Sequence, residues 1–156
     1  MTIEQISLRA HNGVTAVVFG VDPSTVETAG YEGPDVSIEI LLGDLEARAV
    51  IPTYAFDLEG IAEFFREIDR DWRGWAGEKK FEGPGRWFAM DAEHDGKGHV
   101  DLKVTLSNGW PMKRLWTVEA TVPMDVGSID GLAGQFEDWV GRFVPHGNSA
   151  GTPRNG

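Results

Sequence analysis

The chain has 156 residues, of which 41% are apolar and 25% charged, as is typical of one globular domain that can bury a core. Fourteen Lys and Arg residues against 25 Asp and Glu residues give a formal net charge of −11, which disfavours binding to the phosphates of nucleic acids. Cysteine is absent, which excludes disulfides and thiolate metal sites, and the sequence contains neither a membrane-spanning run nor a recognisable secretory signal. We therefore expect a cytoplasmic protein that binds neither nucleic acid nor membrane.

The first third of the chain predicts two β-hairpins. Alternating apolar and polar residues flank Asn12-Gly13, a turn sequence in which both residues tolerate a positive φ. A second alternating pair of strands, over 36–42 and 45–51, is joined by a Gly-Asp turn and ends at a proline, which lacks a ladder donor. Residues 21–34, rich in Thr, Gly, Pro and acidic residues, are predicted to form a loop between the hairpins.

A strongly amphipathic helix is predicted over 57–75. Apolar residues recur at every third or fourth position, and Asp57 is suitably placed to act as the N-cap. The opposite side carries charges of both signs and is expected to face solvent. The expected buried stripe consists of Leu58, Ile61, Phe65, Ile68, Trp72 and Trp75.

Three alternating strands and a second helix are predicted next. The strands comprise a hairpin over 86–106 and a further strand over 116–122, and the helix runs from about Asp125 or Ser128 to Phe143. The last residues, 146–156, are dominated by Gly, Asn, Ser, Thr and Pro and are expected to form a disordered tail. We therefore expect one α+β domain over residues 1–145.

The predicted order of elements is ββββαβββα. Short turns between consecutive strands imply antiparallel pairing, and a helix with a single apolar stripe covers one face of a sheet. The sequence therefore predicts an α+β fold in which two helices pack on one face of a single antiparallel sheet. The opposite face of that sheet is expected to be exposed to solvent.

Alternation gathers carboxylates on this outer face. A three-residue loop sets Asp91 opposite Asp101, whereas a five-residue loop sets Glu93 opposite Asp101. Either register places like charges across from each other, at a cost of roughly 0.2–1 kcal/mol. Glu119 on the next strand extends the patch, which is either a tolerated solvated face or a docking surface for a basic partner.

Two tryptophans lie at strand margins, where an aromatic side chain can either pack on the core or anchor a partner. These are Trp87 and Trp110, whereas the other tryptophans fall on core stripes or in the helices. The candidate partner-binding residues are therefore Asp91, Glu93, Asp101, Glu119, Trp87 and Trp110.

Metal binding and catalysis are weaker interpretations of the same region. His94 and His99 flank the turn among carboxylates, which suit zinc, but their spacing matches no helical His-x-x-x-His pattern, and a histidine at a strand end usually hydrogen-bonds to the loop backbone. Paired carboxylates can hydrolyse bonds only where a cleft gives them different environments. No nucleophile elbow, Walker loop or dinucleotide fingerprint is present. We expect no enzyme activity, no cofactor and no metal.

Three segments carry a family resemblance. They are the helix and its end at 57–79, the run Asp95-Gly96-Lys97-Gly98-His99-Val100-Asp101-Leu102, and the strand Trp116-Thr117-Val118-Glu119-Ala120. The stretch from Tyr54 to Ala133 resembles small uncharacterised actinobacterial domains of unknown function that are similar to the WapI-type immunity proteins. The resemblance implies an α+β sheet domain that binds and neutralises a toxin, and it assigns no functional residues.

Two functional hypotheses follow. The first is a non-enzymatic intracellular binding protein, of the immunity or antitoxin class, that masks a basic toxin domain with its acidic face. The second is a small-ligand-binding or regulatory module with a pocket between sheet and helices. A buried polar pocket in the structure would favour the second hypothesis.

Overall fold

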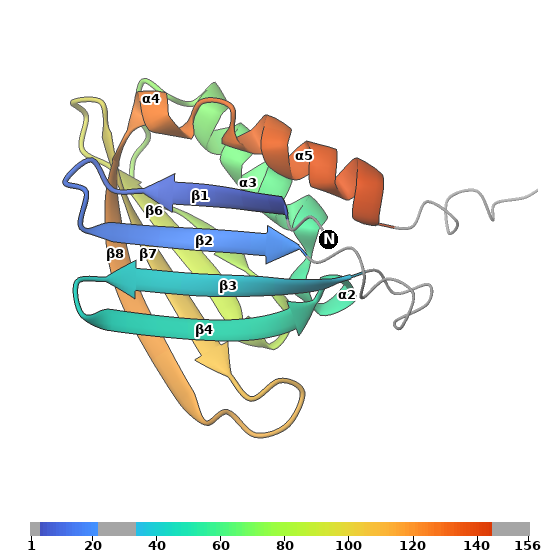
Figure 1. Ribbon diagram of the computed structural model, residues 1–156. Coiled ribbons are helices and arrows are strands. Elements are labelled where there is room, and N and C mark those ends of the chain that lie inside the picture. Colours follow the sequence, from blue (N-terminus) through green and yellow to red (C-terminus); the bar gives the residue numbers. More distant parts are fainter. Residues whose placement is uncertain (1–3, 22–33, 145–156) are drawn as a thin grey trace, which may run out of the picture.

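The computed structural model describes residues 4–21 and 34–144. These residues form two four-stranded antiparallel sheets and two longer helices (Figure 1), which confirms the α+β class and the antiparallel pairing. The strands divide between two sheets instead of forming the single sheet that was expected. Nearly all of the expected loop at 21–34, and all of the expected tail at 146–156, lie outside the described residues.

The first sheet contains the two predicted hairpins. Its strands follow the chain order and are β1 (Glu4–Arg9), β2 (Thr15–Val21), β3 (Asp35–Leu42) and β4 (Leu45–Pro52). The first hairpin forms at the predicted place, but of the two turn residues only Gly13 adopts a positive φ, of 75°. The Asn12 side chain instead accepts a hydrogen bond from the Val14 N–H at 2.9 Å. The Ala10 N–H closes this hairpin by donating to the Thr15 carbonyl at 2.9 Å.

The two sheets are separated in the chain by α2 (Thr53–Phe56) and α3 (Leu58–Arg70). Asp57 caps α3 as predicted, with its side chain accepting a hydrogen bond from the Gly60 N–H at 3.0 Å. The helix ends before Trp72, which was expected in the buried stripe but is 51% exposed. The reason is a chain reversal after Arg70, in which Gly74 has a φ of 133° that other residues rarely adopt.

The second sheet also follows the chain order. Its strands are β5 (Glu78–Glu82), β6 (Phe88–His94), β7 (His99–Asn108) and β8 (Trp116–Asp125), with a short 3₁₀ turn, η2 (Pro84–Arg86), between β5 and β6. Strand β5 was not predicted, because Phe81 is its only fully buried side chain and its sequence shows no apolar alternation. The chain then forms α4 (Val126–Ile129) and α5 (Leu132–Phe143).

Both sheets and both longer helices share one core. Phe19 of β2 contacts Phe88 of β6 at 5.5 Å between ring centroids and Phe136 of α5 at 5.2 Å. Phe65 of α3 stacks on Phe136 at 5.4 Å. The first sheet runs across the strands of the second, and α3 and α5 lie together beyond β1 (Figure 1). The helices therefore close the space between the sheets, and each sheet keeps an outer face.

Candidate functional site

The outer face of the second sheet carries a row of three carboxylates. The β6–β7 pairing sets Glu93 opposite Asp101, as the five-residue loop predicted, and the unforeseen β5 sets Glu78 opposite Glu93. The alternative register, with Asp91 opposite Asp101, is wrong, because Asp91 pairs with Lys103. Among the described residues, no ion pair involves Glu93 or Asp101.

The next row along the strands is balanced in charge. Asp91 lies between Lys80 and Lys103, whose Nζ atoms are 3.4 Å and 3.8 Å from its carboxylate oxygens. Lys80 also bonds Glu78 at 2.8 Å, and this bond, with the charge of Asp91, raises the pKa of Lys80. The bond to Lys80 likewise holds the pKa of Glu78 below its usual range. Asp91 was expected to belong to the acidic surface, but its charge is largely matched by the two lysines.

Glu119 lies apart from the carboxylate row. It is opposite Thr105 on β7, and its carboxylate is 4.0 Å from the Lys103 Nζ. Its side chain remains 60% exposed. The acidic surface therefore does not extend across β8 in the way that the sequence suggested.

The row continues instead into the β6–β7 turn. Asp95 accepts hydrogen bonds from the Lys97 N–H at 2.6 Å and the His99 N–H at 3.1 Å, and its other oxygen is 2.8 Å from His99 Nδ1. These bonds, chiefly the one from Lys97, lower the pKa of Asp95 to about 2. Asp125 adds a further carboxylate, 3.5 Å from His99 Nε2.

The other histidine that flanks the turn, His94, hydrogen-bonds to backbone groups, as predicted. His94 Nδ1 accepts a hydrogen bond from the Gly96 N–H at 2.8 Å, so Nε2 carries the proton and donates it to the Trp72 carbonyl at 3.0 Å. The Trp75 ring packs edge-on against His94 at 5.2 Å. Within 4–21 and 34–144, no three His, Asp or Glu side chains are grouped so that they could hold a metal ion.

A cavity of about 480 Å³ opens beside this turn. Its lining consists of Asp69, Trp72, Gly98, Val126, Gly127 and Asp130. The exposed indole of Trp72 and two carboxylates make it a suitable place for a cation, and the Arg73 guanidinium already lies 5.0 Å from the centroid of that ring. Sequence reasoning missed this cavity because it assigned Trp72 to the buried stripe. Gly74 and Gly77, which follow Trp72 and disfavour a helix, were the only sequence signal that the helix ends early.

We call these neighbouring groups the acidic end of the molecule. It lies where the β6–β7 turn and α4 come together (Figure 1). Its members are Glu78, Glu93, Asp101, Asp95, Asp125, Asp69 and Asp130.

The two tryptophans that the sequence left open as either packing residues or partner anchors, Trp87 and Trp110, pack against each other. Trp87 is 8% exposed and meets the Trp110 ring edge-on at 5.7 Å. The Arg114 guanidinium covers Trp87 at 4.5 Å and donates a hydrogen bond to the Gly85 carbonyl. Two exposed apolar residues, Met112 and Leu115, lie in the β7–β8 loop that contains Trp110. No periodic pattern in the sequence predicts them.

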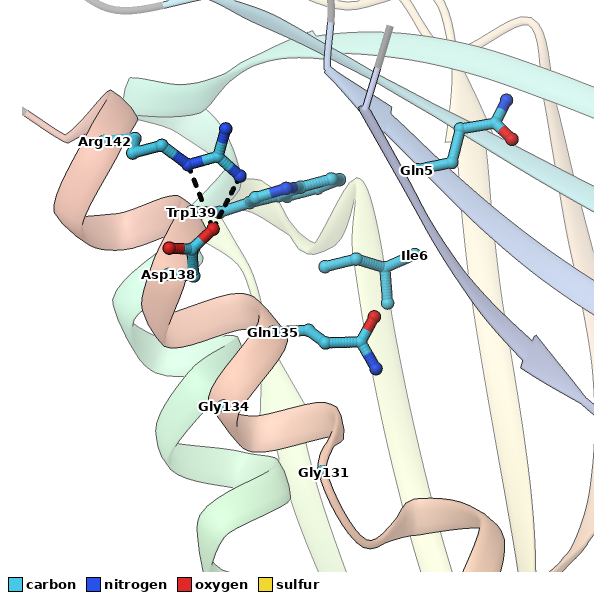
Figure 2. A pocket seen from close by; sticks show the side chains of 8 residues that line it. All are labelled: Gln5, Ile6, Gly131, Gly134, Gln135, Asp138, Trp139 and Arg142. Atoms are coloured by element: carbon cyan, nitrogen blue, oxygen red, sulfur yellow. Dashed lines mark hydrogen bonds and ion pairs between the residues drawn. The ribbon is translucent and has the colours of Figure 1, made fainter.

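A second cavity, of about 450 Å³, lies between the first sheet and α5 (Figure 2). Strand β1 forms one side, and α5 forms the other along nearly its whole length. Its lining consists of Gln5, Ile6, Gly131, Gly134, Gln135, Asp138, Trp139 and Arg142. Asp138 and Arg142 form an ion pair at 2.6 Å across one helical turn. This cavity occupies the position expected for a ligand pocket between sheet and helices.

The fold and these surfaces define an acidic α+β domain with two antiparallel sheets. Residues 20–142 match the model of DUF6228, a family of unknown function, and the chain belongs to this family. The match includes the whole second sheet and α3, and β1 lies outside it. None of the curated proteins compared with the chain matches it significantly. No helix in the described parts of the chain is long and apolar enough to cross a membrane.

Proposed function

We propose that this protein is a non-enzymatic binding protein of the immunity or antitoxin class, which masks a basic toxin domain with the acidic end of the molecule. The net charge of −11 steers such a partner toward it and speeds their encounter. We choose a toxin domain as the partner because the sequence of residues 54–133 resembles domains of unknown function that are similar to the WapI-type immunity proteins. The cytoplasm is the compartment in which an immunity protein of this kind acts.

The observation that carries the proposal is the carboxylate row of the second sheet. Like charges directly opposite each other on neighbouring strands destabilise a sheet, by roughly 0.2–1 kcal/mol for each pair. The adjacent Lys80, Asp91 and Lys103 demonstrate that these strands accommodate alternating charges. Glu93 and Asp101, by contrast, face each other directly and have no lysine as a cross-strand neighbour. Both carboxylates are therefore available to cations of a partner.

The cavity beside Trp72 adds a more specific feature. A Lys or Arg side chain that enters it meets the Trp72 ring, beside Arg73 or in its place, together with the carboxylates of Asp69 and Asp130. Long-range charge sets the rate of association, whereas a desolvated cation on an aromatic ring slows dissociation. The acidic end thus offers both fast association with a basic domain and slow dissociation from it.

The test begins with capture of the partner from the source organism, using the tagged protein and mass spectrometry. Association rates are then measured by surface plasmon resonance for the double variant Glu93→Gln, Asp101→Asn. The matched control is Asp44→Asn, Glu46→Gln, which changes the net charge equally at the β3–β4 turn and the adjoining end of β4. We expect only the first variant to lower the association rate and its dependence on salt, because exposed charges act locally within about 8 Å at physiological ionic strength.

Equal rates for the two double variants contradict the proposal, because the effect then depends on net charge alone. A partner whose own surface is acidic also contradicts it. Circular dichroism of both variants controls for folding.

The second candidate function is a small-ligand-binding or regulatory module. It is favoured by the cavity of about 450 Å³ between β1 and α5, a volume within the range of small-molecule sites. A thermal-shift screen of small molecules tests it, with Gly134→Phe as the variant that fills the cavity. A compound that raises the melting temperature of the wild type but not of this variant supports the second candidate.

A further inference from the structure

Within the part of the chain that the structure describes, β1 is an edge strand of the first sheet. The Ala10 N–H donates to the Thr15 carbonyl, and this bond sets the phase of the β1–β2 ladder. Hydrogen-bonded pairs alternate along an antiparallel ladder, so the main-chain groups of Gln5, Ser7 and Arg9 point away from β2. The sheet order ends at β1, and none of the hydrogen bonds within 4–21 and 34–144 uses these outward groups.

Helix α5 forms a wall alongside this edge. The residues that face the cavity are spaced three or four apart along α5 and form one stripe (Figure 2). Gly131 and Gly134 contribute no side chain, and open space surrounds both positions. Ile6 and Trp139 form an apolar floor, and the ion pair of Asp138 with Arg142 lies at the rim (Figure 2). The result is a groove bounded by a strand edge and a helix.

We propose that this groove binds an extended polypeptide segment of a partner protein, which pairs its main chain with the outer edge of β1 and places an apolar side chain over Ile6 and Trp139. The inference rests on the second candidate function and names its class of ligand. It is independent of the acidic end, which lies elsewhere on the molecule.

The chemistry of the edge selects this ligand. Outward N–H and C=O groups recur at every second residue of β1, and an extended backbone is the ligand that presents matching acceptors and donors at that spacing. A partner strand that adds to a sheet edge obtains its affinity from these bonds and its specificity from a side-chain pocket. The groove provides both features.

Two other occupants fit less well. A second copy of the chain would have to bring its own sheet edge past α5, which stands beyond β1 (Figure 1), and the net charge of −11 repels another copy. The C-terminal residues 145–156 follow α5 directly, but they contain no large apolar side chain to cover the floor.

The experiment selects peptides from a random library displayed on phage, and the most enriched peptide is synthesised and titrated against the full chain. Two variants test the two walls of the groove. Gly134→Phe fills it from α5, and its control Gly141→Phe places the same ring on α5 outside the lining, where there is equally open space. Ser7→Pro removes one outward N–H of the edge strand, a position at which proline is tolerated, and its control Ser7→Ala retains that N–H.

We expect the peptide to perturb the amide resonances of β1 and of the residues of α5 that line the groove. Gly134→Phe and Ser7→Pro should each weaken its binding about tenfold or more, while the two controls leave the dissociation constant unchanged. Circular dichroism of all four variants confirms that they fold. A selected peptide that binds the test variants and their controls equally well overturns the inference.

Other results overturn it in different ways. If no peptide maps to the groove while a small molecule still binds there, the inference fails and the second candidate function stands. If neither binds, both fail. Tighter peptide binding after truncation behind Val144 identifies the chain's own C-terminal segment as the occupant. A dimer of the full chain that Ser7→Pro dissociates identifies a second copy.

Discussion

The outer faces of the two sheets have the same architecture but different arrangements of charge. On the first sheet, Glu39 lies opposite Arg48, and the row continues through Val18 to Ser7. On the second sheet, the equivalent cross-strand row contains only carboxylates until it reaches Pro123. Four antiparallel strands therefore do not require unbalanced charge, and the acidic row is a property of this particular surface. This difference in charge between the two faces is the basis of our proposal that the second face, and not the first, meets a partner.

The largest predicted effect tests whether the two sheets form one cooperative unit. Phe65 is fully buried and stacks on Phe136, which in turn contacts Phe19 of the first sheet. Phe65→Ala should reduce the free energy of unfolding by roughly 3–5 kcal/mol, because it leaves a cavity in the shared core. Urea denaturation monitored by tryptophan fluorescence and by far-UV circular dichroism measures this loss. Transitions that separate between the two probes would show that the sheets unfold independently.

A smaller effect is expected from exchanging the charge arrangements of the two faces. Arg48→Glu sets two glutamates opposite each other on the first sheet, and Glu93→Lys places a cation beside Asp101 on the second. The first change should destabilise the protein and the second should stabilise it, each by roughly 0.2–1 kcal/mol. Chemical denaturation at low salt measures both differences, which should shrink at high salt. Changes of the same sign in both variants are incompatible with the comparison.

The smallest effect concerns the turns of the two sheets. The β1–β2 turn is held by the neutral side chain of Asn12, whereas the β6–β7 turn is held by the carboxylate of Asp95, whose pKa is lowered from 3.8 to about 2. A lowered pKa contributes stability above the unfolded-state value of 3.8, and this contribution disappears as the pH falls toward 2. Asp95→Asn makes the second turn resemble the first.

The wild type should therefore be more stable than Asp95→Asn at neutral pH, and the difference should decrease between about pH 5 and pH 2. The asparagine retains an oxygen that accepts from the Lys97 and His99 N–H groups, so the variant removes only the charge and the oxygen that faces His99 Nδ1. Urea denaturation across this pH range measures the difference. A difference that remains constant down to pH 2 contradicts the assigned role of the carboxylate.

Local patterns were sufficient to predict most individual elements of the fold. The Asn12-Gly13 hairpin, the cap at Asp57 and the opposition of Glu93 to Asp101 were all predicted from turn chemistry and from alternation with a period of two residues. Alternation alone left two registers open for the last of these, because an odd loop length of either size keeps core residues on the core side. The hydrogen bonds of the turn at Asp95 select between them.

The candidate sites were predicted less well, for a different reason. Whether Asp91 is an available carboxylate depends on Lys80, which reaches it from a strand that has no apolar pattern of its own. Whether Trp72 is buried depends on where α3 ends, and whether Trp87 is exposed depends on Arg114 folding back over its ring. To predict any of these outcomes, one must know which segment, distant in the sequence, packs against the residue in question.

The sequence by itself determined the class of fold, the antiparallel pairing within each hairpin, the apolar faces and the acidic charge, because these follow from periodicity and composition over a few neighbouring residues. Only the tertiary structure decided that the strands divide into two sheets, that β5 completes the carboxylate row, and that α5 lies along the free edge of β1. These features depend on contacts between residues far apart in the chain, and their free energy arises from packing and hydrogen bonds that no local pattern records.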